Sequence, residues 1–295
     1  MKKQDDKLRI LHIWNTAGVG SVIAKFMDSF YPTESQVVMR KSFDKFGFTT
    51  TGEVWDCGST VFCLKAFLKA RKFDVLHIHG VDKIIPYIRT CYGNKPIILH
   101  YHGTDIRDRW REKEHLWFKA NKVFYSTEDV WTYDYPNAGE YLPNPIDTDL
   151  FFPDGDIERV ANSALSFRYG ADEVARQFAK ANELSLILHD RENSPIPYVE
   201  LRRFLCQFEY YIDAKYVGHS LSKTALEALA CGCKVISKFG NIITRLPEDH
   251  KPHNVAQRIW QIYNELGISK DIINEYGHAE KENDLLTVEV RSEIV

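Results

Sequence analysis

Short apolar runs alternate with amphipathic helical patterns along this chain, and this alternation limits the possible folds more than any other feature. In the first half, six runs have the length of strands, at residues 9–14, 36–39, 75–79, 97–102, 122–125 and 140–142. Helical patterns separate most of them, at residues 21–30, 61–71, 84–90 and 108–120. Such an alternation favours βαβ units and a parallel sheet covered by helices.

The same alternation starts again after a break that contains Pro143 and Pro145. Strand-like runs at residues 164–167, 185–189, 210–213 and 233–237 alternate with helical patterns at 171–181, 198–206 and 222–231. We therefore predict an α/β fold of two Rossmann-like, doubly wound domains facing each other across a cleft. The expected domains are residues 1–145, a short second domain at 146–251, and a C-terminal helix and tail at 252–295. Ligands of such sheets bind at the carboxyl ends of the strands.

Composition excludes some classes of function. The net charge of -3 gives no general attraction to nucleic acid. No apolar run approaches the roughly 20 residues that span a bilayer, and the first residues do not resemble a signal peptide. The six scattered cysteines are expected to be reduced thiols of a cytoplasmic protein.

The segment from Ser222 to residue 237 reads as a helix, a glycine stop and a buried strand. Ser220 or Ser222 can cap the helix, and Gly232 can adopt the left-handed conformation that ends it. Glu227 places a carboxylate among small apolar residues, where it needs a partner. Two interpretations stay open: the carboxylate grips a pair of ligand hydroxyls, or the helix dipole stabilises it.

The turn after the first strand contains Gly18 and Gly20. The two glycines let the backbone approach a ligand, and the following helix N-terminus favours an anion or a polar group. The third glycine of a dinucleotide fingerprint is absent, so a merely tight turn is the alternative.

Histidines end two of the predicted strands. His77 and His79 share one side of the run at 75–79, where we expect His79 and Asp82 to line the cleft and His77 to be a satisfied core residue. A metal site is not predicted, because no acid or cysteine stands near them at ligand spacing.

His102 ends the run at 97–102, and Asp105 and Arg107 follow it closely, which makes this the second strand end with a histidine. Together they can hold sugar hydroxyls and a developing oxyanion, which makes His102 and Asp105 the candidate catalytic residues. The alternative is a capping aspartate with an ion pair nearby.

Two further segments have structural and functional interpretations. Asp147 and Asp149 resemble a metal-binding pair, but they follow the two prolines and are better explained as a turn and cap. The bases and aromatic residues at 107–118 can rest peripherally on an anionic membrane surface. A helix with Trp110, Trp117 and Phe118 turned inward is favoured.

In series, several segments resemble the GT-B glycosyltransferases, in particular the large retaining group 1, or family 4. These segments are the glycine turn, VLHIH at 75–79, YHGTD at 101–105, LPNPIDTDLF at 142–151, IPYVELRRFL at 196–205 and TALEALACGCKVI at 224–236. The resemblance covers residues 8–266, with a shortened C-terminal domain. It implies transfer of a hexosyl group from a nucleoside diphosphate sugar, with UDP or GDP as the nucleotide, without a metal or another cofactor.

The resemblance also implies individual roles. Glu227 matches the second glutamate of the family's E-x7-E motif, which holds the ribose, and His219 replaces the first glutamate, which contacts the donor sugar. Ser222 belongs to a segment whose amides approach the donor. Arg168 matches a phosphate-binding arginine, but Asp172 and Glu173 stand where its partner lysine is expected. Lys223 or Arg191 can compensate for the diphosphate charge, and His102 matches a histidine beside the reacting sugar.

The leading hypothesis is thus a retaining glycosyltransferase. The expected partners are a nucleotide sugar and a hydroxyl acceptor on a glycan, a lipid or a small molecule. The alternatives are a non-catalytic nucleotide-sugar-binding or partner subunit, and a nucleotide-sugar epimerase of the same fold.

Overall fold

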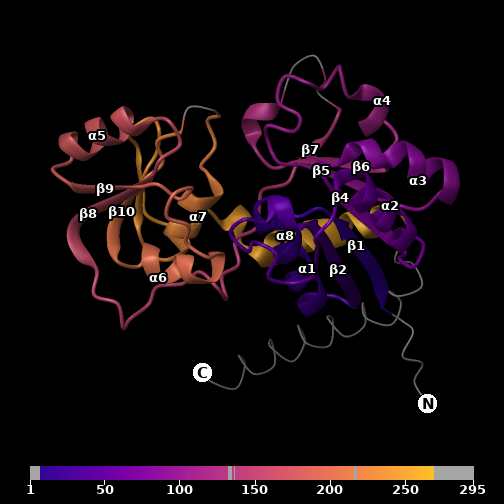
Figure 1. The fold of residues 1–295 in the computed structure, drawn as a ribbon, viewed down its shortest axis with the longest axis horizontal. Helices are drawn as coiled ribbons and strands as arrows, with labels where there is room; N and C mark the ends of the chain where they lie inside the picture. The colour runs from indigo at the N-terminus through magenta and orange to yellow at the C-terminus, as the bar shows by residue number, and fades with distance from the viewer. Residues whose placement is uncertain (1–6, 132–134, 136, 216–217, 269–295) are drawn as a thin grey trace, which may run out of the picture.

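The computed structural model describes residues 7–131, 135, 137–215 and 218–268, which form two α/β units (Figure 1). The first unit holds a parallel sheet of seven strands in the order β3-β2-β1-β4-β5-β6-β7. The strands are β1 (Leu8–Ile13), β2 (Thr33–Arg40), β3 (Glu53–Trp55), β4 (Val75–His79), β5 (Ile97–Tyr101), β6 (Lys122–Tyr125) and β7 (Glu140–Tyr141). The order reverses between β1 and β4, the place where sheets of this kind bind ligands.

Helices cover both faces of this sheet. The helices packed on it are α1 (Val19–Phe30), α2 (Ser59–Ala70), α3 (Ile85–Tyr92), α4 (Glu114–Trp117) and α8 (Pro252–Glu265). α1 and α8 bury Ile10, Ile98 and Phe124 on one face. Although α8 follows the second unit in sequence, it crosses back and completes the core of the first unit (Figure 1).

The second unit holds a sheet of five strands in the order β12-β11-β10-β8-β9. They are β8 (Val160–Phe167), β9 (Ser185–His189), β10 (Phe208–Ile212), β11 (Lys234–Ile236) and β12 (Ile242–Ile243), and β12 alone of these runs antiparallel. The helices are α5 (Asp172–Ala181), α6 (Leu201–Leu205) and α7 (Lys223–Ala230). The strand order reverses between β10 and β8, so both units have a switch point.

The predicted class, two Rossmann-like α/β units, is confirmed, but some elements differ. The short strands β3 and β12 carry too few apolar residues to be visible in the sequence. The helix expected at 108–120 shrinks to α4, and Asp108, with φ +57°, cannot belong to a helix. The expected tail at 269–295 lies outside the described residues.

The segment after Pro143 and Pro145 is anchored to both units. Asp147 accepts hydrogen bonds from the amides of Asp149 (3.1 Å) and Leu150 (3.2 Å), which confirms the turn-and-cap interpretation. Lys25 of α1 adds ion pairs to Asp147 (2.7 Å) and Asp149 (2.8 Å). The two carboxylates are thus neutralised by a lysine of the first unit.

The interpretation of residues 107–118 is correct only in part. Trp110 and Trp117 are buried, whereas Phe118 is 77% exposed. All six cysteines are free thiols. Among the described residues, no helix combines the length and the apolar character needed to cross a bilayer.

Candidate functional site

The helix that carries Glu227 begins and ends as the sequence predicts. Ser222 caps α7 by accepting a hydrogen bond from the Ala225 amide (3.2 Å), and Gly232 adopts φ +83°. Ser222 also donates its hydroxyl and its amide to Asp213, both at 2.7 Å. Asp213 follows β10, so the start of α7 is fixed to the carboxyl edge of the second sheet.

Glu227 is buried and has two partners within its own unit. Its Oε1 accepts hydrogen bonds from Lys223 Nζ (2.5 Å) and Tyr198 Oη (2.8 Å). Burial, followed by the neighbouring Glu227 charge, raises the pKa of Tyr198 well above its usual value, so the phenol stays protonated and donates. Lys223 therefore neutralises Glu227, and sequence reasoning missed Tyr198 altogether.

Arg191 follows β9 and is a buried cation, only 7% exposed. Its guanidinium stacks on three aromatic rings, with centroid distances of 4.1 Å to Phe46, 5.3 Å to Phe48 and 5.5 Å to Phe167. Among the described residues, no carboxylate forms an ion pair with it, and Nε lacks a hydrogen-bond partner. The sequence could name Arg191 as a compensating charge but could not show this burial.

Residues 44–50, called the aromatic loop here, belong to the first unit and contact the second. The carbonyl of Phe46 accepts a hydrogen bond from the Tyr198 amide (2.7 Å), and the rings of Phe48 and Tyr198 lie 4.9 Å apart. Tyr198 thus connects the two charged residues: it contacts the loop that covers Arg191, and its hydroxyl bonds Glu227. Arg191 and Glu227 therefore lie near each other, between the two units.

The glycine turn lies beneath this loop. Gly18 has φ +82°, and a Cβ atom there would come within 3.1 Å of the Phe48 carbonyl. A Cβ atom on Gly20 would lie 3.1–3.3 Å from Asn15, Trp14 and His79. In this structure, therefore, protein atoms surround both glycines closely.

Arg168 stands at the carboxyl end of β8, where the phosphate-binding residue was expected. Its side chain is half exposed and donates from Nε to Asp172 Oδ2 at 2.7 Å. The acid found at the place of the expected lysine therefore binds the arginine itself.

His219 contacts the first unit. Its amide donates to Asp129 Oδ2 and the Ser220 hydroxyl donates to Asp129 Oδ1, both at 3.3 Å. Arg107 donates to the same carboxylate. The His219 ring stacks on Phe239 at 5.6 Å. Asp129 thus joins the loop before α7 to the first unit.

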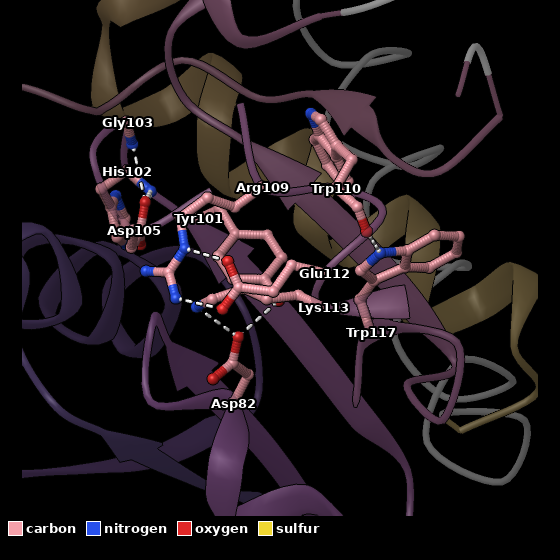
Figure 2. A network of polar contacts seen from close by, with 10 residues as sticks. All are labelled: Asp82, Tyr101, His102, Gly103, Asp105, Arg109, Trp110, Glu112, Lys113 and Trp117. Atoms are coloured by element: carbon pink, nitrogen blue, oxygen red, sulfur yellow. Dashed lines mark hydrogen bonds and ion pairs between the residues drawn. The ribbon is translucent and has the colours of Figure 1, made fainter. Parts of the chain in front are cut away.

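Asp105 and Arg107 have separate partners. Asp105 accepts hydrogen bonds from the amides of His102 and Gly103 at 2.9 Å, as Figure 2 shows. Asp105 is therefore a capping residue of its own turn, while Arg107 pairs with Asp129. The prediction that Asp82 lines the cleft is wrong. Its carboxylate is buried and accepts hydrogen bonds from Tyr101 Oη (2.8 Å) and Lys113 Nζ (2.7 Å) (Figure 2).

Five histidines lie together on one face of the first sheet, the face that α1 and α8 cover. They are His12, His77, His79, His100 and His102. His79 bonds His12 through Nε2 and His102 through Nδ1, each at 3.1 Å. The sequence placed His77 in the core but expected it to be satisfied, whereas neither of its ring nitrogens has a partner among the described residues. His79 was expected to line a cleft and is fully buried.

Burial determines the charge of this histidine cluster. It lowers the pKa of His12 to about 4 and the pKa values of His77, His79 and His100 well below the usual histidine value. Burial also lowers the pKa of His102. The rings are therefore neutral at physiological pH, the form of histidine that binds metals and accepts hydrogen bonds.

A surface hollow of about 1110 Å³ lies elsewhere. It sits beside the amino ends of β1 and β4 and includes Arg9, Trp55, Lys65 and Lys69. Doubly wound sheets bind ligands at the opposite, carboxyl edge, so we place the candidate site between the units.

No protein-family model and no curated protein sequence matches the chain. Several solved structures are similar to it. Anabaena Alr3699/HepE in complex with UDP and glucose shares 10% identity at TM-score 0.50, over 89% of this chain and 91% of that one. The UDP-GlcNAc 2-epimerase of Neisseria meningitidis bound to UDP-GlcNAc shares 12% identity at TM-score 0.49, over 89% and 93%. Acinetobacter baumannii MurG shares 12% at TM-score 0.40, over 87% and 84%. With its two facing Rossmann-like units, the chain has the GT-B fold.

Proposed function

We propose that this chain binds a nucleoside diphosphate sugar between its two units and transfers the hexosyl group to a hydroxyl acceptor. The observation that carries the proposal is Arg191, a buried guanidinium without a carboxylate partner among the described residues. A buried cation is costly unless an anion accompanies it, and a diphosphate supplies that charge with geometry that suits a guanidinium.

The other groups around Arg191 suit the remainder of such a donor. Glu227 lies beyond Tyr198 and can hold a pair of ribose hydroxyls once Lys223 shifts toward a phosphate. The aromatic loop now lies on Arg191, so we expect it to move when the donor binds. Retention of configuration, as in family 4, is part of the proposal.

On the acceptor side, we keep His102 beside the reacting sugar and Asp105 close to it in the chain. Asp105 shapes the turn through the amides of His102 and Gly103, which makes it a positioning residue. The acceptor class remains a glycan, a lipid or a small molecule with a free hydroxyl.

Calorimetric titration with UDP, GDP and ADP tests the donor site. We expect one nucleotide to bind, and we expect Arg191→Gln to weaken its binding at least tenfold, about 1.4 kcal/mol. Arg176→Gln, which removes an exposed arginine of α5, is the matched control and should bind like the wild type. If no nucleotide binds, or if both variants bind equally, the proposal is wrong.

A second candidate, a nucleotide-sugar-binding protein without turnover, has specific support. Arg168 is bound by Asp172, and His219 stacks on Phe239 where the resemblance expects a glutamate that contacts the sugar. Incubation with nucleotide sugars and a panel of acceptors separates the two candidates. Release of nucleotide that depends on the acceptor supports transfer, and tight binding without any release supports the second candidate.

A further inference from the structure

We propose that His79, His100 and His102 bind a divalent transition metal ion of the zinc class, in a site that goes beyond the proposed function. His79 ends strand β4 and pairs with His100 of the neighbouring parallel strand β5, and His102 follows the end of β5. One ring nitrogen of each lies within 4.8 Å of the others. Sequence spacing could not show this, because His79 and His100 become neighbours only when β4 and β5 pair in the sheet.

The distances are close to those of a metal site. His79 Nδ1 and His102 Nε2 are 3.1 Å apart. Two nitrogens that bind one zinc ion at about 2.0–2.1 Å in a tetrahedron lie roughly 3.4 Å from each other. A small rotation of the rings therefore opens the space for an ion, and the ion replaces the proton that the two nitrogens now share.

The outer nitrogen of each ring already has a partner, as metal-binding histidines require. His79 uses Nε2 for His12 (3.1 Å). His100 uses Nε2 for the Ser126 hydroxyl (2.7 Å). His102 uses Nδ1 for Asn144 Oδ1 and Ser126 Oγ, both at 3.1 Å.

The nitrogens that remain for the metal are His79 Nδ1, His102 Nε2 and one ring nitrogen of His100. His100 Nδ1 is buried and has no hydrogen-bond partner among the described residues. A buried imidazole nitrogen without a partner costs free energy, which an ion bound there would recover.

A second group of three histidines, His12, His77 and His79, fits less well. His12 Nε2 and both nitrogens of His77 lack partners in the described structure, so two of the three rings in this group have no outer contact to orient them. All three are also completely buried, whereas His102 keeps a small exposed part. In the group of His79, His100 and His102, therefore, one of the three ligands can be reached from solvent.

The test measures metal directly and needs no activity. Protein without a histidine tag is analysed for bound metal by mass spectrometry, then stripped and titrated with Co²⁺ while the visible absorption is recorded. We expect one ion per chain and the absorption bands of tetrahedral cobalt. His102→Ala, the change at the least buried ligand, should abolish both. Ser126→Ala should keep the fold and weaken Co²⁺ binding by about 10–100-fold.

Two controls define what would overturn the proposal. His115→Ala removes an exposed histidine of α4, and His77→Phe removes a buried neighbour outside the site. Both should keep the ion, and if His77→Phe does not fold, His115→Ala and Ser126→Ala still decide. Absence of stoichiometric metal and of cobalt bands, or unchanged binding in His102→Ala, contradicts the proposal. Loss of the ion in folded His77→Phe but not in His102→Ala assigns the ion to the other group and equally contradicts it.

Discussion

Lys223 Nζ lies 2.5 Å from Glu227 Oε1, one turn apart on α7, and the two side chains are only 10% and 2% exposed. A buried ion pair stabilises a protein little more than two apolar residues in its place would. Removing only one of the two charges is strongly destabilising, however, because the other charge then stays buried without a partner. The Tyr198 hydroxyl completes the arrangement by donating to the same oxygen.

We predict that Lys223→Met destabilises the protein by about 3–5 kcal/mol, because it leaves the buried Glu227 carboxylate without its cation. The measurement is the free energy of unfolding in urea at neutral pH. Lys223→Met combined with Glu227→Gln should recover most of this loss, since no buried charge remains. A single variant as stable as the wild type would show that Glu227 does not depend on Lys223.

The alternation of apolar runs predicted both sheets, and β4, β6 and β9 begin and end where the sequence placed them. In each of these strands a few apolar residues stand between polar ones, so the ends are visible locally. The short strands β3 and β12 form by pairing with a neighbour, and no local pattern reveals that pairing. The same holds for α8, whose apolar stripe is clear but whose packing surface on the first sheet is not.

Gly20→Ala is predicted to destabilise the protein by about 1–3 kcal/mol, although alanine is the better helix former. Gly20 lies inside α1, and a methyl group there would be 3.2 Å from the Trp14 carbonyl and 3.3 Å from His79 Nε2. Thermal unfolding should show the loss. Ala24→Gly, in the same helix, serves as a comparison for the cost of glycine alone. An increase in stability for Gly20→Ala would show that the Trp14 carbonyl can move away.

The candidate site was less predictable than the fold, because polar residues at strand ends choose partners from distant parts of the chain. Arg107 pairs with Asp129 and not with the adjacent Asp105. Glu227 gains Tyr198, which lies 29 residues earlier. Sequence reasoning located the right strand ends but could not assign their partners.

Asp129→Asn is predicted to loosen the loop before α7. The carboxylate accepts hydrogen bonds from the His219 amide, the Ser220 hydroxyl and Arg107, and a neutral amide cannot replace all three. We expect a loss of about 1.5–3 kcal/mol and faster hydrogen exchange of the His219 amide. Glu128→Gln, an adjacent change outside this contact, is the control. Equal exchange rates in the two variants would show that Asp129 does not hold the loop.

Stability should depend on pH through Glu140, which connects α8 to the first sheet. Burial raises the pKa of this carboxyl, but Lys122 and Arg258, which approach it to 2.5 and 2.6 Å, outweigh burial and lower the pKa overall. A folded-state pKa below the ordinary value of about 4.3 means that the contribution is present above that value. It is lost as the pH falls through the lowered pKa of the folded state.

Glu140→Gln should therefore be less stable than the wild type at pH 7, and the difference should shrink as the pH falls below about 4. Urea unfolding of both proteins from pH 7 to pH 3 measures this difference. Glu265→Gln serves as the control, because that acid contacts the same Arg258 at 3.2 Å from a more exposed position. A difference between Glu140→Gln and the wild type that stays constant over this range would show that charge does not hold α8 at this point. The stabilisation would then come from the apolar residues of α8 alone, with Ile259 and Tyr263 packed against the first unit.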